Sequence, residues 1–230
     1  MIIHRADERG KNDLGWLKSS FSFSFANYHN PQRMGFGKLR VLNDDYIAQG
    51  KGFGAHQHSN MEIITIPLSG ELVHKDSIGK KEVLVPGQIQ AMSAGSGITH
   101  SEFNNSTTKP LELFQIWIET KEEDILPRHE TKTLSLKDNK LTKIVSGIKS
   151  KDTLYIHQDA SIHLGNFTKE EELSYKMGKN HGVFIMAVEG SVKVENETLN
   201  KRDSVEITGL TEIKIKPTAS SKLILIDLSL

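Results

Sequence analysis

The chain has 230 residues, of which 37% are hydrophobic and 25% charged, and its 29 basic and 29 acidic side chains cancel to a net charge of zero. This balance excludes the positive charge of a dedicated nucleic-acid binder, and the composition suits one large or two small globular domains. The chain has no cysteine, so any metal must be held by nitrogen and oxygen ligands.

The N-terminal segment MIIHRADERGKND carries charges where a signal peptide needs an apolar stretch. No later run approaches the roughly 18 apolar residues that a membrane span requires. The absence of cysteine is also compatible with a reducing compartment. We therefore expect a cytoplasmic protein without a membrane partner.

Nearly every segment between residues 21 and 120 is predicted to be a short strand bounded by turn residues. The first, FSFSFA from Phe21, alternates aromatic and small side chains, which is typical of a half-buried strand. Later segments with the same character are GKLRVL, MEIITIPLSGELVHKDS, KKEVLVPGQIQAMS and LELFQIWIET. Many short strands with glycine and proline turns favour a β-sandwich or a β-barrel.

A polar segment at residues 121–130 is predicted to be a linker, so we place one unit at residues 1–125 and a second at 126–230. In the second unit, VFIMAVEGSVKVENETL follows the rhythm of EIITIPLSGELVHKDSI in the first, with Gly190 matching Gly70. The sequence therefore predicts an internal repeat of one architecture.

Two pairs of metal-ligand side chains stand at strand spacing in the first unit. His56 and His58 are two residues apart in FGAHQHSNMEII, and His100 and Glu102 are two residues apart in SAGSGITHSEFN. Alternate side chains of a strand point the same way, so the four converge if the strands lie close together with these faces inward. Three imidazoles and one carboxylate suit a first-row divalent metal.

Glu62 leaves this ligand set open. It follows His58 by four residues, so an uninterrupted strand lets it replace or join Glu102, whereas a bulge turns it away. His74 and Asp76 form another pair two residues apart. They are predicted either to orient a ligand imidazole or to stabilise a turn.

The second unit lacks the candidate ligands. The repeat places Lys176, Gly178 and Gly182 at the positions of His56, His58 and Glu62. We therefore expect a metal in the first unit only. His129 lies in a polar segment and is interpreted as a surface residue.

Several large apolar side chains of the first unit are candidates for lining a substrate cavity, with plain packing as the alternative. The series Phe21, Phe23 and Phe25 is interpreted as core instead. The cavity candidates are Met34, Phe36, Phe53, Met92, Phe114 and Trp117.

The segments FSFANYHNPQRMGFGKLRVLNDD, GFGAHQHSNMEIITIPLSGELVHKDSIG and PGQIQAMSAGSGITHSEFN closely resemble the pirin family of the cupin superfamily. The resemblance covers the first half of the chain in register and the second half loosely. It implies an all-β bicupin, in which two antiparallel jelly-roll barrels pack face to face and the N-terminal barrel alone holds a metal.

The family's ligands, carried over by position, fall on His56, His58, His100 and Glu102, so the resemblance favours Glu102 over Glu62. We expect one divalent metal. Iron(II) is the first expectation, although this ligand set also admits manganese, nickel, copper, cobalt or zinc.

Bacterial members of the family resemble quercetin 2,3-dioxygenases, which open the flavonol ring with dioxygen and release carbon monoxide. The resemblance implies an oxidoreductase that acts on a flavonol, with Glu102 as the base for the 3-hydroxyl proton. The alternative, suggested by eukaryotic members, is an iron-binding regulator or redox sensor that acts through a protein partner. Under either hypothesis we expect a monomer that makes no direct contact with nucleic acid.

Overall fold

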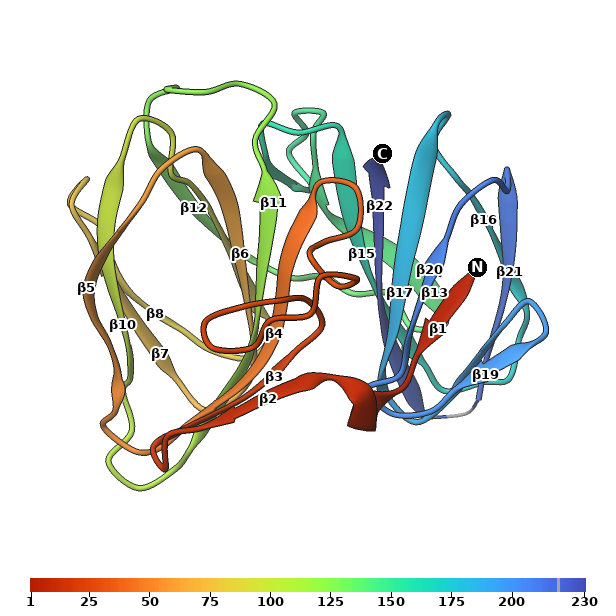
Figure 1. Ribbon diagram of the computed structural model, residues 1–230, viewed down its shortest axis with the longest axis horizontal. Coiled ribbons are helices and arrows are strands. Elements are labelled where there is room, and N and C mark those ends of the chain that lie inside the picture. Colours follow the sequence, from red (N-terminus) through yellow and green to blue (C-terminus); the bar gives the residue numbers. More distant parts are fainter. Residues whose placement is uncertain (219) are drawn as a thin grey trace.

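The alternating segments fold as strands that gather into two halves lying side by side (Figure 1). The computed structural model describes residues 1–218 and 220–230, and within them the one helix is a short 3-10 turn, η1 (Ala6–Glu8). Each half has a seven-stranded and a four-stranded sheet, and the large sheets face each other. The predicted all-β class with two packed units is confirmed. No helix among the described residues is long and apolar enough to cross a membrane.

The first half pairs a large sheet of order β12-β9-β6-β11-β4-β3-β2 with a small sheet of order β5-β10-β7-β8. Within the described residues the two sheets do not join edge to edge, so this half is a two-layer sandwich and not a closed barrel. The large sheet contains β2 (Gly10–Asp13), β3 (Leu17–Phe21), β4 (Leu39–Ile47), β6 (Met61–Ser69), β9 (Gln88–Ser93), β11 (Leu111–Glu119) and β12 (Arg128–Thr133). The small sheet contains β5 (Gly52–His58), β7 (Leu72–Asp76), β8 (Lys81–Leu84) and β10 (Ile98–Asn104).

The second half repeats this arrangement, with sheet orders β1-β20-β17-β22-β15-β13-β14 and β16-β21-β18-β19. The large sheet contains β1 (Ile2–His4), β13 (Lys140–Ser146), β14 (Leu154–Tyr155), β15 (Ala160–Phe167), β17 (His181–Glu189), β20 (Ser204–Ile207) and β22 (Ser221–Ser229). The small sheet contains β16 (Leu173–Lys176), β18 (Val192–Val194), β19 (Glu197–Leu199) and β21 (Glu212–Pro217). Strands β16, β21, β18 and β19 hold the places of β5, β10, β7 and β8, so the predicted internal repeat is present in the topology.

The two hinge glycines of the repeat adopt the same backbone conformation. Gly70 has a φ of 76° and Gly190 a φ of 69°, a region that side chains disfavour. At Gly70 a Cβ atom would also lie 2.5 Å from the carbonyl oxygen of Pro110. Both positions therefore require glycine for the tight turn between consecutive strands.

Two edge strands lie across the expected division at residue 125. Strand β1, at the start of the chain, pairs with β20 of the second half, so that Ile3 lies opposite Val205. Strand β12 follows the division but pairs with β9 of the first half. The halves are therefore tied together by the chain as well as by their packed faces.

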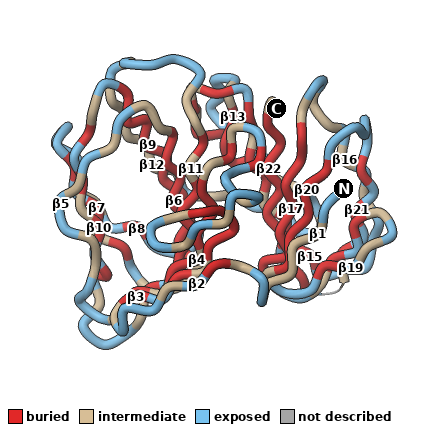
Figure 2. Tube along the Cα trace, viewed as in Figure 1, coloured by how far each residue is buried: buried red, intermediate tan, exposed pale blue. Residues whose placement is uncertain are grey.

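The central core lies between the two large sheets, where Figure 2 shows buried segments of both halves meeting. On β6 and β11 the even-numbered side chains face this core, including Ile64 and Ile116, and β22 contributes Ile224. The rings of Phe23 and Phe184 meet across it, with centroids 6.0 Å apart. Because successive strand residues alternate, the odd-numbered side chains of the same strands face the interior of their own half.

The interiors of the two halves differ in chemistry. The second is filled mostly with aliphatic side chains, with His163 and Asp227 as buried polar exceptions, and β21 and β18 turn Ile213, Ile215 and Val194 inward. In the first half the corresponding small-sheet strands, β10 and β7, carry buried polar groups that include His100 and His74. One copy of the repeat is therefore a packed core, and the other encloses a polar site.

Candidate metal centre

Strands β5 and β10 bring three histidines together inside the first half. The two strands are antiparallel neighbours, with His56 opposite His100 and His58 opposite Ile98. The ring centroids lie 4.4 Å apart for His56 and His100, and 4.9 Å apart for each of the other two pairs. One nitrogen from each ring lies within 4.8 Å of the other two. We call these residues the histidine triad.

The triad offers ring nitrogens that are free to bind a metal. His56 Nδ1 lies 2.8 Å from the carbonyl oxygen of Gly54, to which it donates, so Nε2 is the ring nitrogen left for a metal. Neither ring nitrogen of the buried His100 has a hydrogen-bond partner. Burial, followed by the neighbouring imidazoles, lowers the pKa of His58 to about 4 and that of His100 to about 2. The rings of His58 and His100 are therefore uncharged at neutral pH, as ligation requires.

Glu102 lies beside the triad and is held by an amide. Its carboxylate comes within 4.8 Å of nitrogens of His100 and His74, although it is not close to all three triad rings at once. Gln115 Nε2, on β11, lies 3.0 Å from Glu102 Oε1 and 2.8 Å from Oε2. Burial raises the pKa of Glu102 to about 7.

Glu62 lies on the other face of β6 from the site. Its neighbour Ile63 lines the cavity over the triad, so strand alternation turns Glu62 away. Glu62 Oε2 accepts a hydrogen bond from Ser93 Oγ at 2.7 Å. The structure thus separates the two candidate carboxylates and leaves Glu102 beside the histidines.

A cavity of about 570 Å³ opens over the triad. Of the predicted cavity residues, Phe53 and Trp117 line it. Phe21 and Phe25, interpreted as core, line it as well. Its lining also includes Trp16, Asn43, Asp45, Ile63, Glu102 and Gln115.

The other predicted cavity residues lie elsewhere. Phe36 and Phe114 belong to the core between the large sheets, and Phe114 does so because it lies on the face of β11 that points away from the site. Met92 is buried beside Ile63, its cross-strand partner on β6, and Met34 is exposed. Aromatic or sulfur-containing character alone did not distinguish these positions from cavity positions.

The polar lining residues Asn43, Asp45 and Gln115 were not anticipated. On β11 and β4 these side chains face inward, and Asn43 lies directly opposite Gln115 in the ladder. The one signal in the sequence is polar residues interrupting apolar positions of a predicted strand, as in LFQIW and LNDDY.

A second polar group lies deeper in the same interior. Asp76 Oδ2 is 3.1 Å from His74 Nε2 and 3.0 Å from His129 Nδ1, and all three side chains are almost completely buried. His129 Nε2 also contacts Glu82. The interpretation of His129 as a surface residue is wrong, because β12 pairs with β9 and turns this ring inward. Asp76 Oδ1 also accepts the backbone N–H of Lys80, so it stabilises the turn as well.

Two face-to-face β-sandwiches with a histidine cluster inside the first define a bicupin. The chain belongs to the pirin family: residues 3–118 match the Pirin family model, and residues 143–228 match the quercetinase C-terminal cupin domain.

Similar proteins span nearly the whole chain. A quercetin 2,3-dioxygenase of Escherichia coli strain K12 is 40% identical over 229 residues, which covers 99% of this chain and 98% of the relative. A pirin-like protein of Caulobacter vibrioides is 39% identical, and 96% of each chain is covered. The crystal structure of the bacterial pirin YhhW from Escherichia coli in complex with nickel(II) superposes with a TM-score of 0.95 at 38% identity, covering 99% of this chain and 98% of that one.

Proposed function

We propose that this protein is a metal-dependent dioxygenase that opens the ring of a flavonol such as quercetin with dioxygen and releases carbon monoxide. The observation that carries the proposal is the convergence of three imidazoles beneath a cavity with aromatic walls. Support also comes from the names of its relatives and from the nickel(II) complex of a similar pirin.

The donor set fits a divalent metal ion. His100 is buried with both ring nitrogens unpartnered, an arrangement that is costly unless another group satisfies one of them. His56, His58, His100 and Glu102 would hold the ion, and neutral imidazole nitrogens with one carboxylate suit iron, manganese, nickel, copper, cobalt or zinc. When bound, the ion supplies Lewis acidity that favours the deprotonated 3-hydroxyl of the substrate.

The cavity fits a flat aromatic substrate. Its volume of about 570 Å³ lies within the range of roughly 300–1,000 Å³ typical of small-molecule sites. Phe25 and Trp117 meet edge to face at 5.3 Å, and Trp16 and Phe53 at 5.6 Å, so aromatic rings form much of the wall. These walls place a planar ligand and exclude water from the reacting carbons. A cavity of this size favours the enzyme over a regulator with no room for a three-ring ligand.

Glu102 is the proposed base. Its carboxylate lies beside His100, where a substrate hydroxyl directed at the triad would meet it. The two contacts from Gln115 fix both carboxylate oxygens, so a proton taken from the substrate would rest on an oriented group. The natural partners in this proposal are a flavonol and dioxygen, and the setting is the cytoplasm.

The test is oxygen-dependent loss of quercetin absorbance. Protein stripped of metal would be reloaded with iron(II), manganese(II), nickel(II), copper(II), cobalt(II) or zinc(II), and compared with His100→Ala treated in the same way. Turnover with at least one metal, abolished in the variant, is the expected result, together with release of carbon monoxide. Metal-loaded protein that leaves quercetin intact would overturn the proposal and favour the iron-binding regulator that acts through a protein partner.

A further inference from the structure

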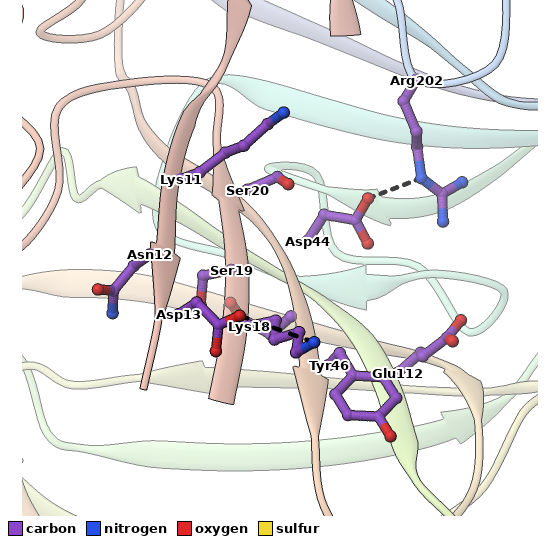
Figure 3. A pocket seen from close by; sticks show the side chains of 11 residues that line it. Lys11, Asn12, Asp13, Lys18, Ser19, Ser20, Asp44, Tyr46, Glu112 and Arg202 are labelled. Atoms are coloured by element: carbon purple, nitrogen blue, oxygen red, sulfur yellow. Dashed lines mark hydrogen bonds and ion pairs between the residues drawn. The ribbon is translucent and has the colours of Figure 1, made fainter. Parts of the chain in front are cut away.

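The two faces of strand β4 carry polar side chains that border different cavities. Asp44 points away from the cavity, toward a second hollow of about 570 Å³ with charged and polar walls (Figure 3). There it accepts a hydrogen bond from Arg202 Nε at 2.7 Å. Its neighbours Asn43 and Asp45, on the alternate face, line the cavity over the histidine triad. Of the two adjacent aspartates, one therefore has a strong cationic partner and the other faces the candidate active site.

Both cavity-facing residues have unused acceptors. Asn43 and Asp45 are each 4% exposed, and neither Asn43 Oδ1 nor Asp45 Oδ1 has a hydrogen-bond partner. A buried acceptor without a donor costs about 1–3 kcal/mol, so folded proteins seldom keep one without a use. Gln115, which lies opposite Asn43, is by contrast fully engaged with Glu102 and Thr65.

These acceptors lie a short way across the sheet from the candidate metal ligands. Asn43 is the cross-strand partner of Gln115, and directly opposed side chains have Cβ atoms about 4.5–5.5 Å apart. Gln115 in turn contacts Glu102 at 2.8 Å. A rigid ligand whose one end is directed at the triad can therefore place another ring near Asn43 and Asp45.

The surrounding walls limit the ligand to flat aromatic groups. Phe21 and Phe25 lie with ring centroids 5.4 Å apart, and Phe25 meets Trp117, so three rings line the same side of the cavity. The ligand must therefore combine an aromatic face with hydrogen-bond donors at its edge. A phenolic hydroxyl supplies such a donor, whereas a methyl ether or a ring hydrogen does not.

We propose that Asn43 and Asp45 form a hydroxyl-recognition subsite that selects polyhydroxylated flavonols over flavonols without ring hydroxyls. The subsite rests on the proposed function for its substrate class. A ring hydroxyl of the substrate donates to the free oxygen of Asn43 or Asp45, while the 3-hydroxyl end lies at the triad and Glu102. A site that offers buried acceptors discriminates strongly, because the analogue without the hydroxyl leaves them unpaired.

The experiment compares quercetin with 3-hydroxyflavone, which keeps the chelating end and lacks the other hydroxyls. Affinity of metal-loaded protein for each would be measured by fluorescence quenching without oxygen, and kcat/KM with oxygen. The proteins are the unsubstituted chain, Asn43→Leu, Asp45→Leu, and Asp44→Asn as a matched control from the other face. Retained binding of 3-hydroxyflavone shows that a variant is folded.

The unsubstituted protein is expected to bind quercetin at least about 10-fold more tightly than 3-hydroxyflavone, since one hydrogen bond contributes about that factor. Asn43→Leu or Asp45→Leu should reduce the preference by about 10-fold, and Asp44→Asn should leave it unchanged. Equal affinity for both flavonols, binding of neither, or a preference that survives in both leucine variants overturns the subsite. Selective binding without turnover supports the subsite while the proposed oxidation fails.

Discussion

Gln115 Nε2 lies within hydrogen-bonding distance of both carboxylate oxygens of Glu102, at 3.0 and 2.8 Å. The amide comes from the large sheet and the carboxylate from the small sheet, so this contact joins the two layers of the first half at its polar centre. The Gln115 side-chain oxygen is in turn engaged by Thr65 Oγ1 at 3.3 Å. Glu102 therefore has a fixed orientation before any substrate arrives.

Substitution of Gln115 should impair turnover because it releases this carboxylate. We expect Gln115→Leu to lower kcat/KM for quercetin by about 10–100-fold, the usual effect of removing a group that orients a metal ligand. Gln49→Leu, on the surface of the same half, is the control and should retain full activity. A Gln115→Leu protein with unchanged kinetics would show that the contact does not position Glu102.

Removal of one triad imidazole should release the metal. Removing a group that hydrogen-bonds to a metal ligand typically weakens metal binding by roughly 10–100-fold. His100→Ala removes a ligand itself, so it is expected to weaken nickel(II) binding by at least this factor. Equilibrium dialysis followed by metal analysis measures this without any enzyme assay. His163→Ala, a buried histidine of the second half, should bind as much metal as the unsubstituted chain. Equal binding by both variants would refute the triad as the metal site.

The deeper group around Asp76 should contribute to stability. His129 bridges Asp76 and Glu82 inside the sandwich, so His129→Ala leaves buried acceptors without their partner. Leaving a buried acceptor without its hydrogen-bond partner typically costs about 1–3 kcal/mol. Urea unfolding should therefore show a loss of this size for His129→Ala and almost none for the exposed His29→Ala. A loss below about 1 kcal/mol would mean that the network is not formed.

Glu62 should make the protein less stable as the pH rises. Burial, the largest cause, raises the pKa of Glu62 from 4.5 to about 7, while the hydrogen bond from Ser93 opposes it. Between these two values the folded state binds more protons than the unfolded state, so the free energy of unfolding falls as pH increases. At about 1.4 kcal/mol per pKa unit, the full change is on the order of 3 kcal/mol.

Glu62→Gln should remove the contribution of Glu62 to this dependence, because the amide does not ionise. Urea unfolding at pH 5 and pH 8 is expected to show a smaller difference for Glu62→Gln than for the unsubstituted protein. Glu112→Gln, an exposed position, should keep the original difference. If Glu62→Gln and the unsubstituted chain lose the same stability between the two pH values, Glu62 is ionised in the folded protein at both.

The sequence by itself determined the strand content, the repeat and the two pairs of candidate ligands, His56 with His58 and His100 with Glu102. Alternation has a period of two, so a pair such as His56 and His58 points one way wherever the strand lies. The positive φ at Gly70 and Gly190 likewise follows from local turn chemistry. These features depend on neighbouring residues only, so the sequence predicts them without knowledge of the fold.

Only the tertiary structure decided which of these faces meet. The choice between Glu62 and Glu102 depended on which face of β6 borders the cavity, and the burial of His129 depended on β12 joining a sheet across the expected division. The cavity-facing positions of Asn43, Asp45 and Gln115 likewise come from the pairing of β4 with β11. Pairing between distant strands is set by the packing of whole sheets, and no local pattern in the sequence encodes it.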